Sequence, residues 1–242
     1  MEYIMAKQEN IKKAMVVFAH PDDAEWGCSA SVARLVREGA EVVYVVCTDG
    51  SKGTEDRSIN GYKLSEIRRK EQINAGKALG LKDVIFLNHP DGYLEPNLDL
   101  RRDISREIRR WKPDLLITTN PKRDLLMSDY LGHPDHFAAG EAALSAVFPS
   151  ARDHLTFPEL LSEGYDTHKV KEVWVIMFGE NSNYINPIIK EDLNKAIKAL
   201  QSHVSQIQDP NEAAKWMTKR RVDLGDSIGC DYAEGFRRYK LS

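Results

Sequence analysis

The chain has 242 residues, of which 42% are hydrophobic and 29% are charged, so it can bury one sizeable core. This composition excludes a disordered tail, a fibrous repeat and a membrane bundle. The 34 basic and 37 acidic residues give a formal charge of -3, without the basic excess that binding to a phosphate backbone uses. We therefore expect one α/β domain and no nucleic-acid partner.

The N-terminal segment and the cysteines bear on location. Residues 1–13 form a polar extension without the continuous apolar stretch of a signal peptide, and no later stretch approaches the roughly 20 apolar residues of a membrane span. The three cysteines are odd in number and widely spaced, which argues against a disulfide framework or a metal knuckle. We expect a cytoplasmic protein without a membrane partner, whose single domain covers residues 14–242.

The first half of the chain alternates short apolar runs with helical periods. Residues 14–19 predict a buried strand, and Pro21 with the aspartates after it predicts the start of a helix that Gly39 ends. The same criteria predict strands at 42–47, 84–87 and 115–118 and helices at 64–79 and 100–111. This alternation predicts a doubly wound, mostly parallel sheet with helices on both faces, which is a Rossmann-like fold.

The second half of the chain is less regular. A loop over 120–132 precedes a helix at about 137–147, and a strand is expected at 173–178. The segment 150–171 has no clean period and is the expected insertion. Apolar residues at spacings of four and three predict one long amphipathic helix that carries Leu193, Ile197, Leu200, Val204 and Ile207.

Two short segments hold side chains suited to metal chemistry. His20-Pro21-Asp22-Asp23 follows the first strand, and His133-Pro134-Asp135-His136 lies in the loop after the fourth. In a doubly wound sheet these strands are commonly neighbours where the winding reverses, and ligands bind beyond their carboxyl ends. Two histidines and a carboxylate suit a divalent metal with one position open for water, whose proton a nearby aspartate can take. Ordinary structure, with aspartates that cap helices, is the alternative.

These residues resemble the zinc-dependent N-acetylglucosaminyl deacetylase family, also called PIG-L or LmbE-like. The similarity runs from about residue 14 to 238 and includes both histidine segments, Glu66 to Glu71, Pro90-Asp91-Gly92, and late segments at 200–206 and 232–237. The resemblance implies one Zn²⁺ per chain, with Fe²⁺ or another divalent metal as an alternative. The metal ligands that it implies are His20, Asp23 and His136.

The resemblance also implies roles around the metal. Asp22 matches the general base, and His133 matches the residue that steadies the tetrahedral oxyanion, which a protonated imidazole can do. Arg68 and Asp91 match positions that lie toward the sugar, although residue type alone also fits a helix ion pair and an Asp-Gly turn. His203 fits either the edge of the core or the rim of the site.

We expect a metal-dependent hydrolase that removes an acetyl group from the amino nitrogen of an N-acetylglucosamine-type sugar or its conjugate. One alternative is a metal-dependent amidase of a non-sugar or thiol-conjugate amide, and another is a non-catalytic Rossmann-like module that binds a small molecule. The first strand lacks a Gly-x-Gly-x-x-Gly after it, which disfavours nucleotide binding. Arginines over 101–112 are interrupted by acids and predict a solvated helix face. The resemblance also allows a homo-oligomer.

Overall fold

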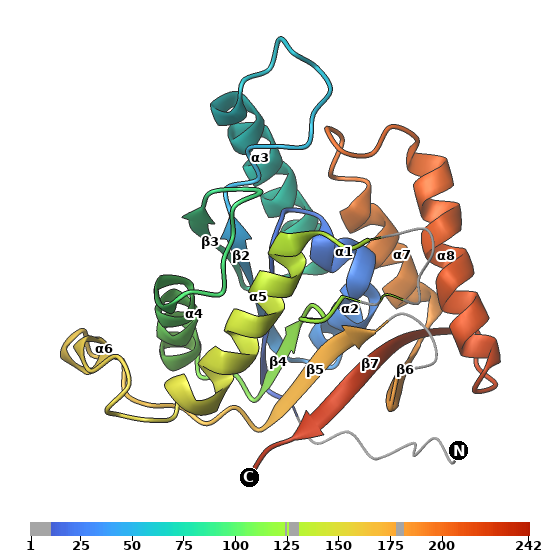
Figure 1. Cartoon of the computed structure of the whole chain (residues 1–242). Coiled ribbons are helices and arrows are strands. Elements are labelled where there is room, and N and C mark those ends of the chain that lie inside the picture. Colours follow the sequence, from blue (N-terminus) through green and yellow to red (C-terminus); the bar gives the residue numbers. More distant parts are fainter. Residues whose placement is uncertain (1–10, 124, 126–130, 178–181) are drawn as a thin grey trace.

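The computed structural model describes residues 11–123, 125, 131–177 and 182–242. These residues form a seven-stranded sheet in the order β3-β2-β1-β4-β5-β7-β6 (Figure 1). The strands β1 to β5 pair in parallel, and β7 pairs antiparallel with both β5 and β6. The strands are β1 (Lys13–Phe18), β2 (Glu41–Thr48), β3 (Asp83–His89), β4 (Leu115–Thr118), β5 (Glu172–Met177), β6 (Tyr184–Ile188) and β7 (Tyr232–Lys240).

The predicted fold class is confirmed. The apolar runs of β1, β2 and β4 are buried because helices cover both faces of the sheet, and in β2 every residue after Glu41 is buried. The run of β3 is only half-buried, because β3 lies at the edge of the sheet. β1 lies between β2 and β4, and Val17 of β1 pairs with both Val45 and Thr118. The winding direction therefore reverses between β1 and β4, as the predicted doubly wound fold implied. Phe178, the last residue of the strand predicted at 173–178, lies outside the described residues. Residues 1–10 of the polar extension also lie outside them.

Helices lie on both faces of the sheet. One face packs on α1 (Asp23–Gly27), α2 (Ser29–Arg37) and α3 (Gly61–Leu79), and the other packs on α4 (Leu98–Trp111) and α5 (Pro134–Ser145), which continues into a short π-helical turn (Ala146–Ser150). The remaining helices are α6 (Glu159–Ser162), α7 (Lys190–Leu200) and α8 (Pro210–Asp226). No helix within the described ranges is both long and apolar enough to cross a membrane.

Two predicted helices differ from the structure. The helix expected after Pro21 is broken at Cys28 into α1 and α2, where α1 ends with Gly27 against β5. A Cβ at Gly27 would lie 2.9 Å from the Cδ1 atom of Ile176, so a larger residue there would have to displace the Ile176 side chain. The prediction of one long late helix is wrong beyond Leu200, because the chain turns there and leaves Val204 75% exposed.

Three late elements escaped the sequence analysis: β6, β7 and α8. β6 contains Pro187, which fits a strand at the edge of a sheet. β7 carries several charged residues, so its sequence does not show the apolar run of a buried strand. The segment 150–171 forms turns and the short α6. Arg109 of α4 anchors it by donating to the carbonyls of Ser150, Asp153 and Thr156, each at 2.8 Å. Arg109 is therefore buried, and the prediction of a solvated face is wrong for this residue.

Candidate metal and catalytic site

The two histidine segments meet at the carboxyl ends of β1 and β4. His20 follows β1, and His133 is the residue that caps the N-terminus of α5, two positions before Asp135 and three before His136. The ring centroid of His20 lies 4.7 Å from that of His133 and 5.2 Å from that of His136. The three imidazoles each offer a nitrogen within 4.8 Å of the others, so they form a cluster that could hold a metal ion.

The three predicted ligands have the spacing of atoms around one ion. The Nδ1 atom of His20 lies 3.2 Å from the Nε2 atom of His136. The carboxylate of Asp23 lies 3.0 Å from that Nε2 atom through Oδ1 and 3.6 Å from the Nδ1 atom through Oδ2. Tetrahedral ligand atoms on a Zn²⁺ ion are roughly 3.3 Å apart, given bonds of about 2.0–2.1 Å. The donor set therefore fits a small divalent metal.

Two further carboxylates orient the ring of His20. Asp135 Oδ2 lies 3.1 Å from His20 Nε2, and Asp91 Oδ1 lies 3.2 Å from it. A proton on Nε2 that faces these carboxylates leaves Nδ1 unprotonated for a metal. Burial lowers the pKa of His20, but hydrogen bonds with Asp135, Asp23 and Asp91 outweigh burial and raise the pKa to about 12. The surrounding carboxylates thus strongly favour a positive charge at this position.

Asp22 does not cap α1 with its side chain, so the helix-capping alternative is wrong for this residue. It occupies the N-cap position with a left-handed backbone, φ 95°, and its carboxylate accepts no capping hydrogen bond among the described residues. Burial and the charge of Asp23 raise the pKa of Asp22 to about 7, against the opposing charge of Arg68. A carboxyl group with a pKa near neutrality is suited to accept a proton from water.

His133 presents a defined donor. Its Nδ1 atom accepts the backbone N–H of Asp135 at 3.2 Å, so the neutral ring carries its proton on Nε2. Burial and the neighbouring His20 lower the pKa of His133, which keeps the ring neutral at pH 7. The side chain is 42% exposed and is accessible to a ligand. A neutral ring with this tautomer has Nε2–H available as a donor, and the predicted role of His133 at the oxyanion stays a prediction.

Arg68 and Asp91 lie at the site but are almost fully buried, with exposed fractions of 5% and 3%. The guanidinium of Arg68 donates to the carbonyls of Pro21 at 2.8 Å and Lys52 at 3.0 Å. Asp91 accepts the backbone N–H of Lys52 at 2.8 Å in addition to its contact with His20. Both side chains hold the loops around the metal ligands, and their predicted contact with sugar hydroxyls stays a prediction.

The sequence analysis missed the buried polar residues behind the site. Asp135 lies within the second histidine segment, and its carboxylate also accepts the N–H groups of Gly92 and Leu94 at 2.7 and 3.3 Å. Glu25 accepts from Gln72 at 3.1 Å, and its other oxygen lies 3.3 Å from His203 Nε2. His203 is fully buried, which favours a place in the core over one at the rim of the site. Two of these residues gave a signal in the sequence, because Asp135 lies between two site histidines and His203 lies in a late segment of the resemblance.

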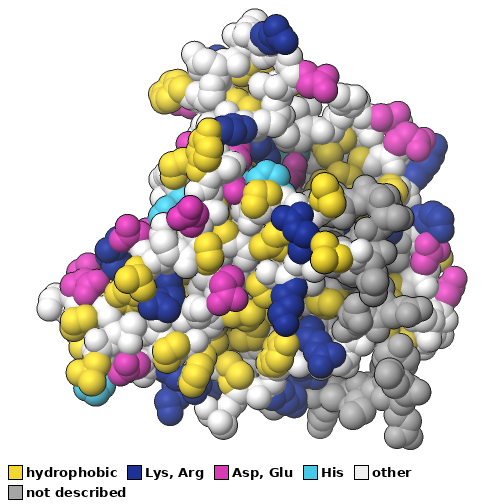
Figure 2. Space-filling model, viewed as in Figure 1, with side chains coloured by type: hydrophobic (Ala, Val, Ile, Leu, Met, Phe, Trp, Pro, Cys, Tyr) yellow, Lys and Arg dark blue, Asp and Glu magenta, His cyan; other side chains and the backbone are white. Residues whose placement is uncertain are grey.

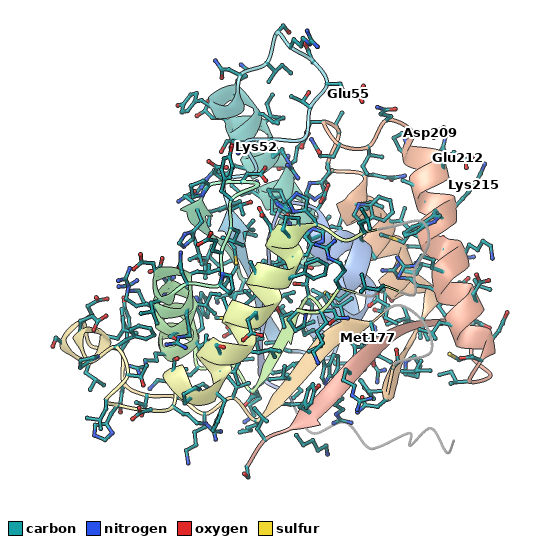
Figure 3. The ribbon with its side chains drawn as sticks, viewed as in Figure 1. Lys52, Glu55, Met177, Asp209, Glu212 and Lys215 are labelled. Carbon is teal, nitrogen blue, oxygen red and sulfur yellow. The ribbon has the colours of Figure 1, made fainter. Side chains whose placement is uncertain are left out.

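The surface around this cluster is hollowed. Figure 2 shows histidine and acidic side chains in the hollow beneath the loop that precedes α3. Lys52 and Glu55 lie on that loop, and Asp209, Glu212 and Lys215 lie across from them at the start of α8 (Figure 3). A separate cavity of about 320 Å³ lies beyond the end of β5, between α1 and α8, and is lined by residues that include Trp26, Met177 and Leu224. None of the predicted site residues lines this cavity.

The geometry defines a doubly wound α/β protein with a histidine and aspartate centre suited to a metal at the switch point of its sheet. Residues 15–147 match the model of the PIG-L family, described as GlcNAc-PI de-N-acetylase, and the chain belongs to this family. PIG-L deacetylases are metal-dependent. The match covers more than half of the chain and includes every predicted site residue.

Named relatives are deacetylases, which hydrolyse carbon–nitrogen bonds other than peptide bonds. The chain is 28% identical over 230 residues to a diacetylchitobiose deacetylase of Thermococcus kodakarensis, which covers 94% of this chain and 83% of the relative. A solved N,N'-diacetylchitobiose deacetylase of Pyrococcus horikoshii has a TM-score of 0.86 and 29% identity, over 99% of this chain and 89% of that one. A 4-carboxy-2-hydroxymuconate hydratase of Pseudomonas putida shares the fold, with a TM-score of 0.77, 20% identity, and coverage of 96% and 97%.

Proposed function

We propose that this protein is a zinc-dependent hydrolase that removes the acetyl group from the amino nitrogen of an N-acetylglucosamine-type sugar or its conjugate. The observation that carries the proposal is the convergence of His20 Nδ1, His136 Nε2 and the Asp23 carboxylate to within 3.0–3.6 Å. These residues would hold one metal ion per chain. A bound Zn²⁺ supplies a Lewis acid that polarises the amide carbonyl and lowers the pKa of water, and Fe²⁺ fits the same donor set.

The chain supplies the proton transfers and the charge stabilisation. Asp22 accepts the proton of the attacking water, since its carboxylate is left unused by the helix cap and its pKa lies near 7. His133 donates its Nε2–H to the oxyanion that develops on the carbonyl oxygen. The water oxygen bonds to the carbonyl carbon, the C–N bond breaks, and the proton that Asp22 accepted passes to the leaving nitrogen. The products are acetate and the amino sugar.

The substrate class is supported by the relatives and by the hollow above the site. Two relatives are named for the deacetylation of diacetylchitobiose, an N-acetylated sugar. Arg68 and Asp91 remain our predicted contacts for sugar hydroxyls. We further propose a cytoplasmic location, which is supported by three free cysteines, and a homo-oligomer stays a prediction by resemblance.

The decisive experiment combines metal analysis with a substrate panel. Wild type, Asp22→Asn and His136→Ala are purified without added metal, their zinc and iron are measured by mass spectrometry, and acetate release is followed from N-acetylated sugars, thiol conjugates and non-sugar amides. His154→Ala is the matched histidine control, since His154 is exposed and lies outside the cluster. We expect Asp22→Asn to keep metal and lose most turnover, and His136→Ala to lose metal.

Four results would contradict the proposal. Full activity of Asp22→Asn would remove the general base, and full metal content of His136→Ala would remove that ligand. Activity confined to the non-sugar amides would replace the sugar with the amidase alternative. An absence of metal even after zinc is offered back would favour the binding-module alternative.

A further inference from the structure

The backbone of Asp22 has a conformation that needs support from its surroundings. Its φ angle of 95° lies in the left-handed region, which is unfavourable for a residue other than glycine. The neighbouring Pro21 restricts the preceding residue but does not impose this angle on Asp22. The direction in which the Asp22 carboxylate leaves the chain depends on this angle, so whatever fixes the angle also aims the proposed general base.

Two residues of α3 hold the peptide that joins Pro21 to Asp22 from both of its sides. The carbonyl of Pro21 accepts from Arg68 Nη2 at 2.8 Å, and the N–H of Asp22 donates to Gln72 Oε1 at 3.0 Å. Arg68 and Gln72 are four residues apart, so they lie on the same face of the helix. The plane of this peptide is thereby fixed by one turn of α3.

Gln72 is itself held in place by buried groups. Its side-chain amide donates to Glu25 Oε1 at 3.1 Å, and Glu25 Oε2 lies 3.3 Å from His203 Nε2. Gln72, Glu25 and His203 all have exposed fractions of 0%. An amide that spans a buried carboxylate and a strained backbone N–H cannot rotate without losing both hydrogen bonds, and each loss would leave a buried polar group unpaired.

We propose that Gln72 is a positioning residue that aims the Asp22 carboxylate at the water above the metal ligands. The inference rests on the proposed function, in which Asp22 is the general base. Gln72 is fully buried, and the only hydrogen bonds of its side chain among the described residues are to Asp22 and Glu25. Arg68 is a less specific support, because it also holds the carbonyls of Gly50 and Lys52.

The test replaces and then restores the two hydrogen bonds. Gln72→Met keeps the length of the side chain and removes both bonds. Gln72→Glu keeps an acceptor for the Asp22 N–H but places a second carboxylate against Glu25. The exchange E25Q/Q72E returns a neutral amide and a carboxylate to the pair, with the amide of residue 25 donating to the carboxylate of residue 72.

A neighbouring residue of α3 provides the control. Glu71 is buried on the same helix and accepts from the backbone N–H and hydroxyl of Ser205, each at 2.7 Å, but it does not contact the Pro21 to Asp22 peptide. Glu71→Gln therefore perturbs the packing of α3 without changing the support of Asp22. Each variant is measured for kcat, KM, bound metal and melting temperature.

We expect kcat of Gln72→Met and Gln72→Glu to fall roughly 10- to 100-fold, because a small misplacement of a catalytic group has effects of this size. KM and metal content should stay within about twofold of wild type, and E25Q/Q72E should regain most of the lost kcat. Unchanged kcat in metal-loaded Gln72→Met would overturn the proposal. An equal loss of kcat in Glu71→Gln, or no recovery in the exchange, would also overturn it.

A crystal structure of Gln72→Met separates this inference from the proposed function. We expect the Asp22 backbone to leave the left-handed region, and an Asp22 that keeps φ near 95° would overturn the inference whatever the activity. Conversely, full turnover by Asp22→Asn would remove the general base and leave the structural result on Gln72 intact. The two failures are therefore distinct.

Discussion

The carboxylate of Asp135 lies 3.1 Å from the Nε2 atom of His20, across the switch point between β1 and β4. The contact joins two segments that are 115 residues apart in the chain. Asp135 is almost fully buried, with 1% of its surface exposed, so water screens the contact little. The pair orients one predicted metal ligand from behind, on the side of the ring opposite the other two.

We expect Asp135→Asn to weaken metal binding roughly 10- to 100-fold, because an outer carboxylate fixes the tautomer of a ligating imidazole. The affinity is measured by titration of the metal-free protein with zinc against a competing chelator. Asp103→Asn is the matched control, since Asp103 pairs with His89 at the same distance of 3.1 Å but away from the cluster. Equal metal affinity in Asp135→Asn and wild type would refute the orienting role.

We expect Arg109→Met to lower the free energy of unfolding by about 2–4 kcal/mol, because it leaves several buried carbonyls of the segment 150–157 without a donor. The comparison is Arg110→Met, whose side chain is 41% exposed and should change stability by about 0.5 kcal/mol or less. Urea unfolding followed by circular dichroism measures both. Similar losses in the two variants would show that Arg109 has no special anchoring role.

We expect Gly140→Ala to disturb both stability and metal binding. A Cβ atom at this position of α5 would lie 2.4 Å from the carbonyl oxygen of Thr119, so the helix must move away from the end of β4. His136 is on the same helix, and its carbonyl accepts the Thr119 hydroxyl at 2.8 Å. The expected cost is about 1–3 kcal/mol of unfolding free energy together with weaker zinc affinity.

Glu141→Ala is the control for Gly140→Ala, since Glu141 is the next residue of α5 and its side chain is exposed. Calorimetry and the chelator titration are run on both variants. A Gly140→Ala protein that melts and binds zinc like wild type would mean that α5 adjusts to the methyl group without displacing the predicted ligand.

The stability of the protein should depend on pH through His203. Burial lowers the pKa of His203, but the carboxylate of Glu25, which lies 3.3 Å from Nε2, outweighs burial, so the pKa in the folded state is raised above 6.5. Because the folded pKa exceeds the unfolded one, the stabilisation is fully present below the unfolded value and is lost as pH rises through the raised value. We expect a fall in the free energy of unfolding over this range that His203→Gln lacks.

The check is urea unfolding of wild type and His203→Gln at a series of pH values on both sides of 6.5. The difference between the two free energies should shrink as pH increases. A difference that stays constant across the range would mean that His203 does not change its charge with the buried Glu25.

The parallel part of the sheet and the place of the site could be predicted because both depend on local patterns. An apolar run such as 14–19 fits only a buried strand, and a polar segment directly after it must lie at the edge of the sheet. The adjacency of β1 and β4 followed from the winding rule. His20, Asp22 and Asp23 could therefore be placed beside His133 and His136 before the structure was known.

The remaining features depend on contacts between distant residues, which leave no period in the sequence. Val204 keeps the helical spacing of Leu200, yet the chain turns because the buried Glu25 and Glu71 bind His203 and Ser205. The sequence does not distinguish Arg109 from the other arginines of α4. Arg109 is buried because the segment 150–157 folds over it. Composition and periodicity cannot distinguish such residues from an ordinary helix surface.

The order of the strands has a consequence for how the protein folds as it is synthesised. β7 lies between β5 and β6, so β6 joins the sheet only through β7. When residues 184–188 have left the ribosome, β6 has no strand to pair with until residues 232–240 have also been synthesised. The parallel half of the sheet, which carries the site, can assemble before then. Deletion of β7 should therefore release β6 as well, and should expose β5 as an unprotected edge on which copies of the chain would aggregate.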